Sequence, residues 1–121
     1  MPRARYDPAL NARIQRDPDI QALVGAYRDL GAEIYVRTGQ VRARDLTLEM
    51  NKLAQQRYGL PANYAVNPRS GQLSDLGSFR QAIGPIAAMV MPMLSVLLTP
   101  TAAASGGAGY AVPQGTVAGL T

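Results

Sequence analysis

Two pairs of carboxylates are the residues whose types and spacing come closest to a chemical site. Asp29 and Glu33 lie four residues apart, as do Asp45 and Glu49. On a helix this spacing puts both members of a pair on one face, where they could hold a metal ion or exchange protons. Carboxylate-bridged metal bundles use His as well as Glu, and this chain has no His. The pattern therefore favours solvated helix faces over a metal or acid–base site.

Nucleophilic and phosphate-binding chemistry also lacks its usual residues. No serine can join a Ser-His-Asp triad without His, and the spacing does not pair Lys52 with a serine. The glycines of residues 106–109 resemble a phosphate loop, but no Lys-Ser or Lys-Thr follows them. Cys is absent, which excludes disulfides and thiolate metal sites. We therefore predict that the protein is not an enzyme and uses no cofactor or metal.

Arginine supplies nearly all of the positive charge. The chain has 12 Lys and Arg against 8 Asp and Glu, a net charge of +4, and Lys52 is its single lysine. Arg favours bidentate contact with carboxylate or phosphate. The candidate residues for contact with phosphate or an acidic partner are Arg3, Arg5, Arg13, Arg16, Arg37, Arg42 and Arg44.

These arginines allow two interpretations. The N-terminal arm could dock on a neighbouring subunit, or the arginines could contact packaged nucleic acid non-specifically. Arg37, Arg42 and Arg44 surround an expected turn between two helices, as in a helix-turn-helix. Asp45 and Glu49 would repel phosphate there, so sequence-specific recognition is disfavoured.

A first amphipathic helix is expected over residues 18–36. Asp17 can cap it, and Pro18 suits the first helical position. Apolar residues then recur at spacings of three and four from Ile20 to Ile34, which predicts one buried stripe.

A second amphipathic helix is expected from residues 41–45 to about Tyr58. Gly39 would end the first helix in the left-handed conformation, and Gly59 followed by Pro61 would end the second. Two such helices joined by a short turn make an αα-hairpin.

The predicted fold class is mainly α, with an N-terminal αα-hairpin, an apolar kinked third helix and an extended tail rich in Gly and Ala. Ser74 is expected to cap the third helix. The expected parts are an Arg-rich arm with a helical turn near its end (1–16), the hairpin (17–59), a loop (60–73), the apolar helix (74–99) and the uncharged tail (100–121). The N-terminus has no apolar stretch typical of a secretory signal.

The uncharged C-terminal third is the dominant feature of the chain. No Asp, Glu, Lys or Arg occurs from Gln81 to Thr121, and residues 82–98 are an almost unbroken apolar run. A membrane span needs about 20 such residues, so this run is of borderline length. Gly84-Pro85 and Pro92 would each break or kink an isolated helix.

Three interpretations of the apolar run remain open: insertion in a bilayer, burial against copies of itself or a partner, or the core helix of a small fold. Because residues 86–98 are apolar all round, we expect burial on every side, and the methionines favour adaptable packing. The candidate residues for assembly or membrane packing are Ile83, Ile86, Met89, Val90, Met93, Leu94 and Leu97.

The organisation of the chain resembles that of small virion proteins of tailed bacteriophages, in particular internal or ejection proteins. The features that carry this resemblance are the Arg-rich helical part up to Arg80, the apolar IGPIAAMVMPMLSVLL and the tail ASGGAGYAVPQGTVAGL. The resemblance implies a multi-copy structural role in the virion, assembly in the host cytoplasm beside portal or core proteins, and a later step at a host membrane during genome delivery.

The predicted function is thus that of a non-enzymatic structural component of an oligomeric assembly. Its partners would be protein subunits, either its own copies or other virion proteins, with a membrane and non-specific nucleic acid as further contacts. The alternatives are a small bacterial membrane-associated protein with a cytoplasmic helical hairpin, and a soluble helical adaptor.

Overall fold

The computed structural model describes residues 6–98, so Arg3, Arg5 and the tail of residues 100–121 lie outside the described residues. The chain is mainly helical, as the sequence predicted. Its elements are α1 (Pro8–Gln15), α2 (Pro18–Leu30), the 3₁₀ helix η1 (Gly31–Tyr35), α3 (Arg37–Tyr58), β1 (Tyr64–Val66), β2 (Leu73–Asp75), α4 (Leu76–Ile83), the 3₁₀ helix η2 (Gly84–Ile86) and α5 (Ala87–Leu97).

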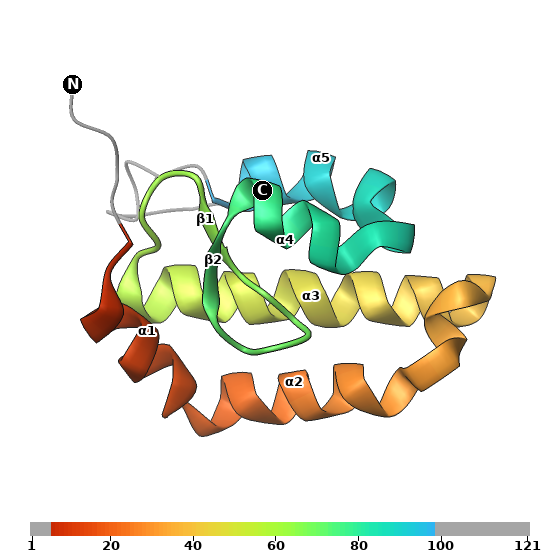
Figure 1. The fold of residues 1–121 in the computed structure, drawn as a ribbon, viewed down its shortest axis with the longest axis horizontal. Coiled ribbons are helices and arrows are strands. Elements are labelled where there is room, and N and C mark those ends of the chain that lie inside the picture. Colours follow the sequence, from red (N-terminus) through yellow and green to blue (C-terminus); the bar gives the residue numbers. More distant parts are fainter. Residues whose placement is uncertain (1–5, 99–121) are drawn as a thin grey trace, which may run out of the picture.

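Helix α3 is the central element. Figure 1 shows α2 along one side of α3 and α5 along the other, with α4 next to α5 and the β-hairpin. The buried residues of α3 include the small side chains of Gly39, Ala43 and Ala54, which let both layers approach its backbone closely. The predicted αα-hairpin is present as α2 and α3, with η1 as the connection.

The turn between α2 and α3 differs from the prediction. Helix α2 ends at Leu30, and Gly31 takes the positive φ of 51° that stops it. Gly39 does not end the first helix, and that prediction was wrong. Helix α3 already begins at Arg37, so Gly39 lies in its first turn and is buried. A Cβ on Gly39 would overlap the main-chain carbonyl of Glu33, so glycine is required there by close packing.

Residues 8–16 belong to the folded domain, where the sequence predicted an arm with only a helical turn. Asp7 caps α1 by accepting hydrogen bonds from the amides of Ala9 and Leu10. Leu10 and Ile14 are buried against the rest of the domain. This burial, which an arm would lack, fixes α1 against α2 and β2.

The expected loop of residues 60–73 contains an antiparallel hairpin. Val66 pairs with Leu73 and Tyr64 with Asp75. The buried Asn51 side chain of α3 holds this hairpin, since its Oδ1 accepts from Val66 N at 2.7 Å and its Nδ2 donates to Val66 O at 3.2 Å. The amide group of Asn51 therefore acts as a strand neighbour for Val66.

The apolar helix is broken, as its Gly-Pro pair predicted. Asp75, and not Ser74, caps α4, with its side chain accepting from Ser78 N at 2.9 Å. Gly84 ends α4 with a φ of 36°, and one turn of η2 redirects the chain into α5. Pro92 lies within α5, where it cannot donate the helical hydrogen bond to the carbonyl of Ala88.

We predict that Gly39→Ala destabilises the protein by about 2 kcal/mol, because the added methyl group must displace the Glu33 backbone. Gly25→Ala is the matched control: it lies in α2, and apart from its chain neighbours and the nearby backbone of that helix, no atom lies within 4 Å of the place that its added methyl group would take. The control variant should be more stable than the wild type by up to about 1 kcal/mol, because Ala has a higher helix propensity than Gly. Urea denaturation measures both values, and equal effects of the two variants would contradict the close approach at Gly39.

We predict that Asn51→Ala destabilises the protein by about 3 kcal/mol, because it leaves the buried N–H and C=O of Val66 without their partner. Lys52→Ala, at the exposed neighbouring position, should change the stability by no more than about 0.5 kcal/mol. Thermal unfolding followed by circular dichroism checks both. A small effect of Asn51→Ala would mean that water replaces the side-chain amide.

Candidate functional site

The inner face of the apolar segment is used within the chain itself. Ile83, Ile86, Val90 and Leu94 are among the most deeply buried side chains of the domain. They face α3 and its neighbours, so the structure places these four candidate packing residues in the chain's own core. The burial of this face agrees with one of the three interpretations of the apolar run, in which it is the core helix of a small fold.

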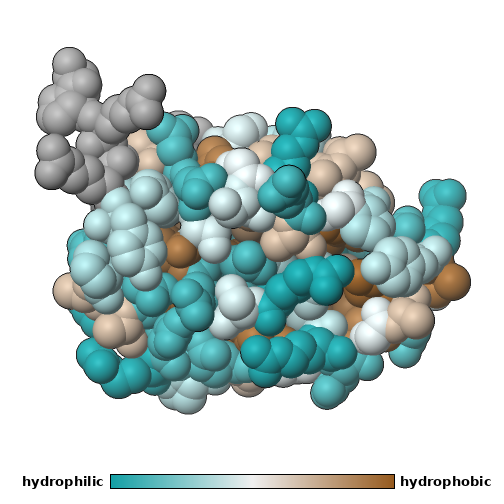
Figure 2. Space-filling model, in the orientation of Figure 1, coloured by the Kyte–Doolittle hydropathy of each residue, from teal (hydrophilic) through white to brown (hydrophobic). Residues whose placement is uncertain are grey.

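The outer side of α5 is exposed and, apart from Ser95, apolar, which differs from the expected burial on every side. We call the residues Ala88, Met89, Pro92, Met93 and Val96 the outer face. The exposed fraction is 76% for Val96 and 50% for Met93, while Met89 is half-buried. Leu97, another candidate packing residue, is half-buried beside them. Figure 2 shows pale brown surface along the upper edge of the molecule, over α5.

A shallow cavity of about 220 Å³ lies beside the last turns of α5. Its walls come from residues 61–63, from Leu76 and from Met91, Leu94 and Leu98. The lining is mostly apolar, so an apolar side chain of a bound partner would fit it.

A second exposed apolar cluster lies where η1 turns into α3. It consists of Tyr35, Val36 and Val41, with exposed fractions of 66%, 53% and 36%. Figure 2 shows brown surface at this end of the molecule. Because η1 packs next to η2, the cluster adjoins the end of the apolar helices where α5 begins.

Length and composition would allow residues Leu76–Leu97 to cross a membrane, as one candidate span. In this structure the break at Gly84 divides that segment into two helices, and one face of it is covered by α3. Within the described part of the chain, these features favour two packed helices over a single membrane-spanning helix.

The candidate arginines within residues 6–98 lie at separate elements, two at the end of α1 and three in the first half of α3. Arg13 stacks over the ring of Tyr58, with 5.1 Å from its guanidinium carbon to the ring centroid. Arg44 pairs with the adjacent Asp45 at 3.0 Å, an exposed contact of little energetic weight. Arg16, Arg37 and Arg42 are exposed, and no ion pair is found for them among residues 6–98.

Asp17 is the most highly connected ionised group of the domain. Its Oδ1 accepts from the amides of Asp19 and Ile20 at 3.0 and 3.2 Å, as predicted for a helix cap. Arg57 Nη1 lies 2.9 Å from both carboxylate oxygens, and Tyr58 Oη donates to Oδ2 at 2.6 Å. The carboxylate thus joins the start of α2 to the end of α3.

These contacts determine the pKa of Asp17. Burial alone would raise the pKa, but hydrogen bonds from Tyr58, Arg57 and the Ile20 amide outweigh burial and lower it from 3.8 to about 2. Arg57 also reaches Asp19 Oδ2 at 2.7 Å, and these partners raise the pKa of the guanidinium further.

The carboxylate pairs form no metal site in the described part of the chain. Asp29, Glu33, Asp45 and Glu49 are exposed, and no group of three or more potential His, Cys, Asp or Glu ligands gathers within residues 6–98. Asp29 and Glu33 lie away from the core, on the solvated face that the sequence predicted.

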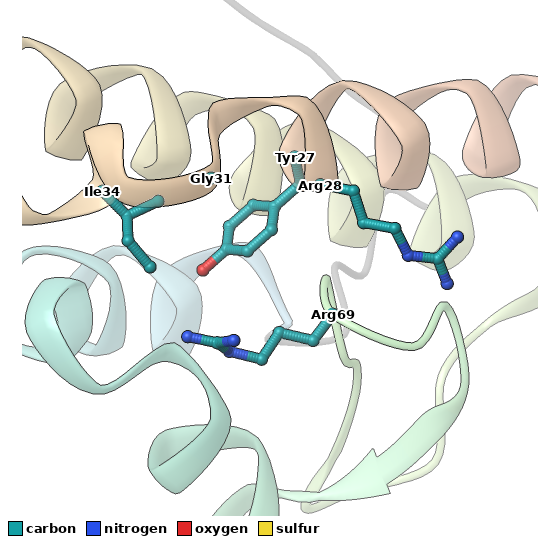
Figure 3. A pocket seen from close by; sticks show the side chains of 5 residues that line it. All are labelled: Tyr27, Arg28, Gly31, Ile34 and Arg69. Carbon is teal, nitrogen blue, oxygen red and sulfur yellow. The ribbon is translucent and has the colours of Figure 1, made fainter.

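A small cavity under η1 contains a buried hydroxyl group. The cavity has a volume of about 160 Å³ and is lined by Tyr27, Arg28, Gly31, Ile34 and Arg69 (Figure 3). Tyr27 is only 4% exposed, and its hydroxyl has no hydrogen-bond partner within the described chain. Burial raises the pKa of Tyr27 despite the opposing charge of Arg69, so at neutral pH this hydroxyl carries its proton.

Comparison with protein-family models, curated proteins and solved structures finds no match. The surfaces and contacts of the chain itself are therefore the basis for proposing a function.

No pattern in the sequence marks the cavity under η1. Tyr27 lies in the apolar stripe between Ile20 and Ile34, and Arg28 and Arg69 lie 41 positions apart in the sequence. Only the fold of the hairpin loop places Arg69 opposite α2, where its Nε donates to Ala82 O at 2.6 Å. The presence of a tyrosine in an otherwise aliphatic stripe was the available signal.

We predict that the stability of the protein falls as the pH decreases from about 4 to about 2. The folded-state pKa of Asp17 is lowered, so its contribution is complete above 3.8 and is lost as the carboxylate takes up a proton. Asp17→Asn keeps a helix cap but loses the ion pair, and should cost about 1 to 3 kcal/mol at neutral pH.

Urea denaturation at several pH values measures this effect. The acid-dependent loss should be smaller in Asp17→Asn than in the wild type, with a remainder from Asp75, whose pKa is also lowered. The exposed Asp29→Asn variant should keep the wild-type profile. The interpretation fails if Asp17→Asn and Asp29→Asn have the same profile.

Proposed function

We propose that this chain is a non-enzymatic structural subunit that docks on a neighbouring protein subunit through the outer face of α5. The observation that carries the proposal is the exposure of this face: Val96 and Met93 are largely open to solvent on a helix without a single charged residue. Surface helices of isolated domains carry polar residues on their outer side. A contiguous apolar surface of this kind is typical of an interaction site.

The chemistry of the outer face favours a protein partner over lipid. Pro92 offers no N–H to the carbonyl of Ala88, and both residues are exposed. A protein partner can supply a donor to this carbonyl directly, whereas in a bilayer a neighbouring helix or a local change of the backbone would have to satisfy it. Met89 and Met93 can adapt their side chains to a partner's surface. The half-open cavity beside Leu98 supplies a recess next to the same helix.

The setting that we propose is the virion of a tailed bacteriophage, in which the chain is a multi-copy internal or ejection component. The support for this setting is the organisation of the sequence, a compact Arg-rich helical part followed by an uncharged C-terminal third. The exposed arginines Arg16, Arg37 and Arg42 would then be available to packaged nucleic acid or to acidic neighbours. Detection of the chain in purified particles by mass spectrometry would be expected.

A membrane role is the second candidate, because Leu76–Leu97 has the length and composition of a span. Insertion of this segment would require α4 and α5 to leave α3 and expose the core that Ile83, Ile86 and Val90 now fill. Exposing this core costs free energy. Insertion would therefore be a separate state of the chain, reached during genome delivery, and not the state described by this structure.

We predict that Val96→Asp abolishes self-association or binding to the neighbouring subunit while the domain stays folded. Val96 is exposed, so the new carboxylate is solvated in the free chain and is desolvated only in an interface. Ala22→Asp, also at an exposed helical position but in α2 on the opposite side of α3, is the matched control and should keep the assembly.

Sedimentation velocity over a range of protein concentrations measures self-association, circular dichroism measures the folded state, and flotation with lipid vesicles measures membrane binding. Loss of association in Val96→Asp alone supports the proposal. Vesicle binding that Val96→Asp removes supports the membrane role instead. If Val96→Asp and Ala22→Asp both assemble as the wild type does, the outer face is not the docking surface.

A further inference from the structure

The cavity under η1 supplies hydrogen-bond donors without matching acceptors. Its polar side chains are the Tyr27 hydroxyl, the Arg28 guanidinium and the Arg69 guanidinium, and its other walls are Gly31 and Ile34. Neither Arg28 nor Arg69 has an ion-pair partner within residues 6–98. No carboxylate lines the cavity. The lining therefore offers positive charge and hydrogen-bond donors to an anion.

The geometry of the site is set by Arg69. Its Nε is held by Ala82 O at 2.6 Å, which leaves the two terminal amino groups for another acceptor. Figure 3 shows the Tyr27 hydroxyl pointing toward the side of the cavity on which the Arg69 guanidinium lies, while the Arg28 guanidinium points away from the hydroxyl. The buried Tyr27 thus forms the inner part of the site, and Arg28 and Arg69, which are both exposed, line its open side.

The buried hydroxyl is a second, independent feature that suits a hydrogen-bonding ligand. A buried polar group without a partner costs about 1 to 3 kcal/mol, and Tyr27 Oη is such a group among the described residues. An anion placed between this hydroxyl and Arg69 would accept from both, and charged acceptors form the stronger hydrogen bonds.

We propose that this cavity binds the carboxylate of an acidic side chain from a neighbouring protein subunit. The cavity, with a volume of about 160 Å³, leaves room for a carboxyl group on a short aliphatic stem. The apolar wall at Ile34 fits such a stem, and Arg pairs with a planar carboxylate through two parallel hydrogen bonds. The proposal depends on the proposed function only for the source of the carboxylate.

A nucleic-acid phosphate fits the surroundings less well. Asp29 and Glu33 lie on the exposed surface of the same helical segment, next in sequence to Arg28 and Ile34. A polyanion would carry further phosphates past these two carboxylates, which would repel it, whereas a single side-chain carboxylate brings one charge only.

The experiment uses the full chain and N-acetylglutamate α-amide, a probe with one carboxylate on an aliphatic stem. N-acetylglutamine α-amide is the neutral control of the same shape. Titrations at constant ionic strength are followed by the amide NMR signals of Gly31, Ile34 and Arg69. We expect saturable shifts of these signals with the acidic probe and none with the neutral one.

Two variants test the residues. Tyr27→Phe should weaken binding of the acidic probe about tenfold, the effect of one lost charge-assisted hydrogen bond, and Arg69→Gln at least as much. Arg80→Gln, at another exposed arginine, should leave the binding unchanged. Tyr27→Phe should also keep or raise the melting temperature of the free protein, because it removes an unpaired buried hydroxyl.

Each contrary result overturns the proposal. The site is absent if no saturable shift occurs up to the solubility of the acidic probe, or if Tyr27→Phe lowers the melting temperature. A short single-stranded oligonucleotide that shifts the same signals at lower concentration would show that the site binds phosphate instead. Val96→Asp should not change the titration, so a failure here is distinct from a failure of the docking surface on α5.

Discussion

The buried Asp17 carboxylate closes the αα-hairpin on which the other elements pack. It caps α2 and, through Arg57 and Tyr58, binds the last turn of α3. The two helices could slide along each other if apolar contacts alone held them, because such contacts have no direction. A buried carboxylate tolerates no such movement, since it would lose its partners in a medium of low dielectric constant. The alignment of α2 and α3 in turn determines where α1 and the β-hairpin can lie.

Helix α3 needs a cover on both sides, and this requirement explains the C-terminal helices. One side of α3 is covered by α2, and the other by η2 and α5, while α4 packs on the β-hairpin and on α5. The sharp turn at Gly84 lets the chain pass from α4 on the hairpin to α5 on the surface of α3, which a straight helix would leave. Only one face of α5 is needed for this cover. The opposite face remains apolar and exposed. Helix α5 thus has more apolar residues than the cover of α3 needs, and the proposed contact with a neighbouring subunit would use the surplus.

Local patterns in the sequence predicted much of the fold. The Asp17-Pro18 start of α2, the apolar stripe from Ile20 to Ile34 and the break at Gly84 depend on neighbours in the chain, and all three appear as expected. The predictions for Gly39, for the arm and for the loop of residues 60–73 failed for one shared reason. Each depends on a contact from outside the segment: the Glu33 carbonyl for Gly39, the burial of Leu10 and Ile14 for α1, and Asn51 for the β-hairpin.

By itself the sequence determined the helical class, the absence of His and Cys chemistry, and the separation of a charged part from an uncharged C-terminal third. These features follow from composition and short-range periodicity. Only the tertiary structure decided which apolar residues are available to a partner, because Val90 and Val96 are alike in type and differ only in what covers them. It also brought Arg69 beside Tyr27, since that approach depends on the path of a loop held by Asn51 and Ala82.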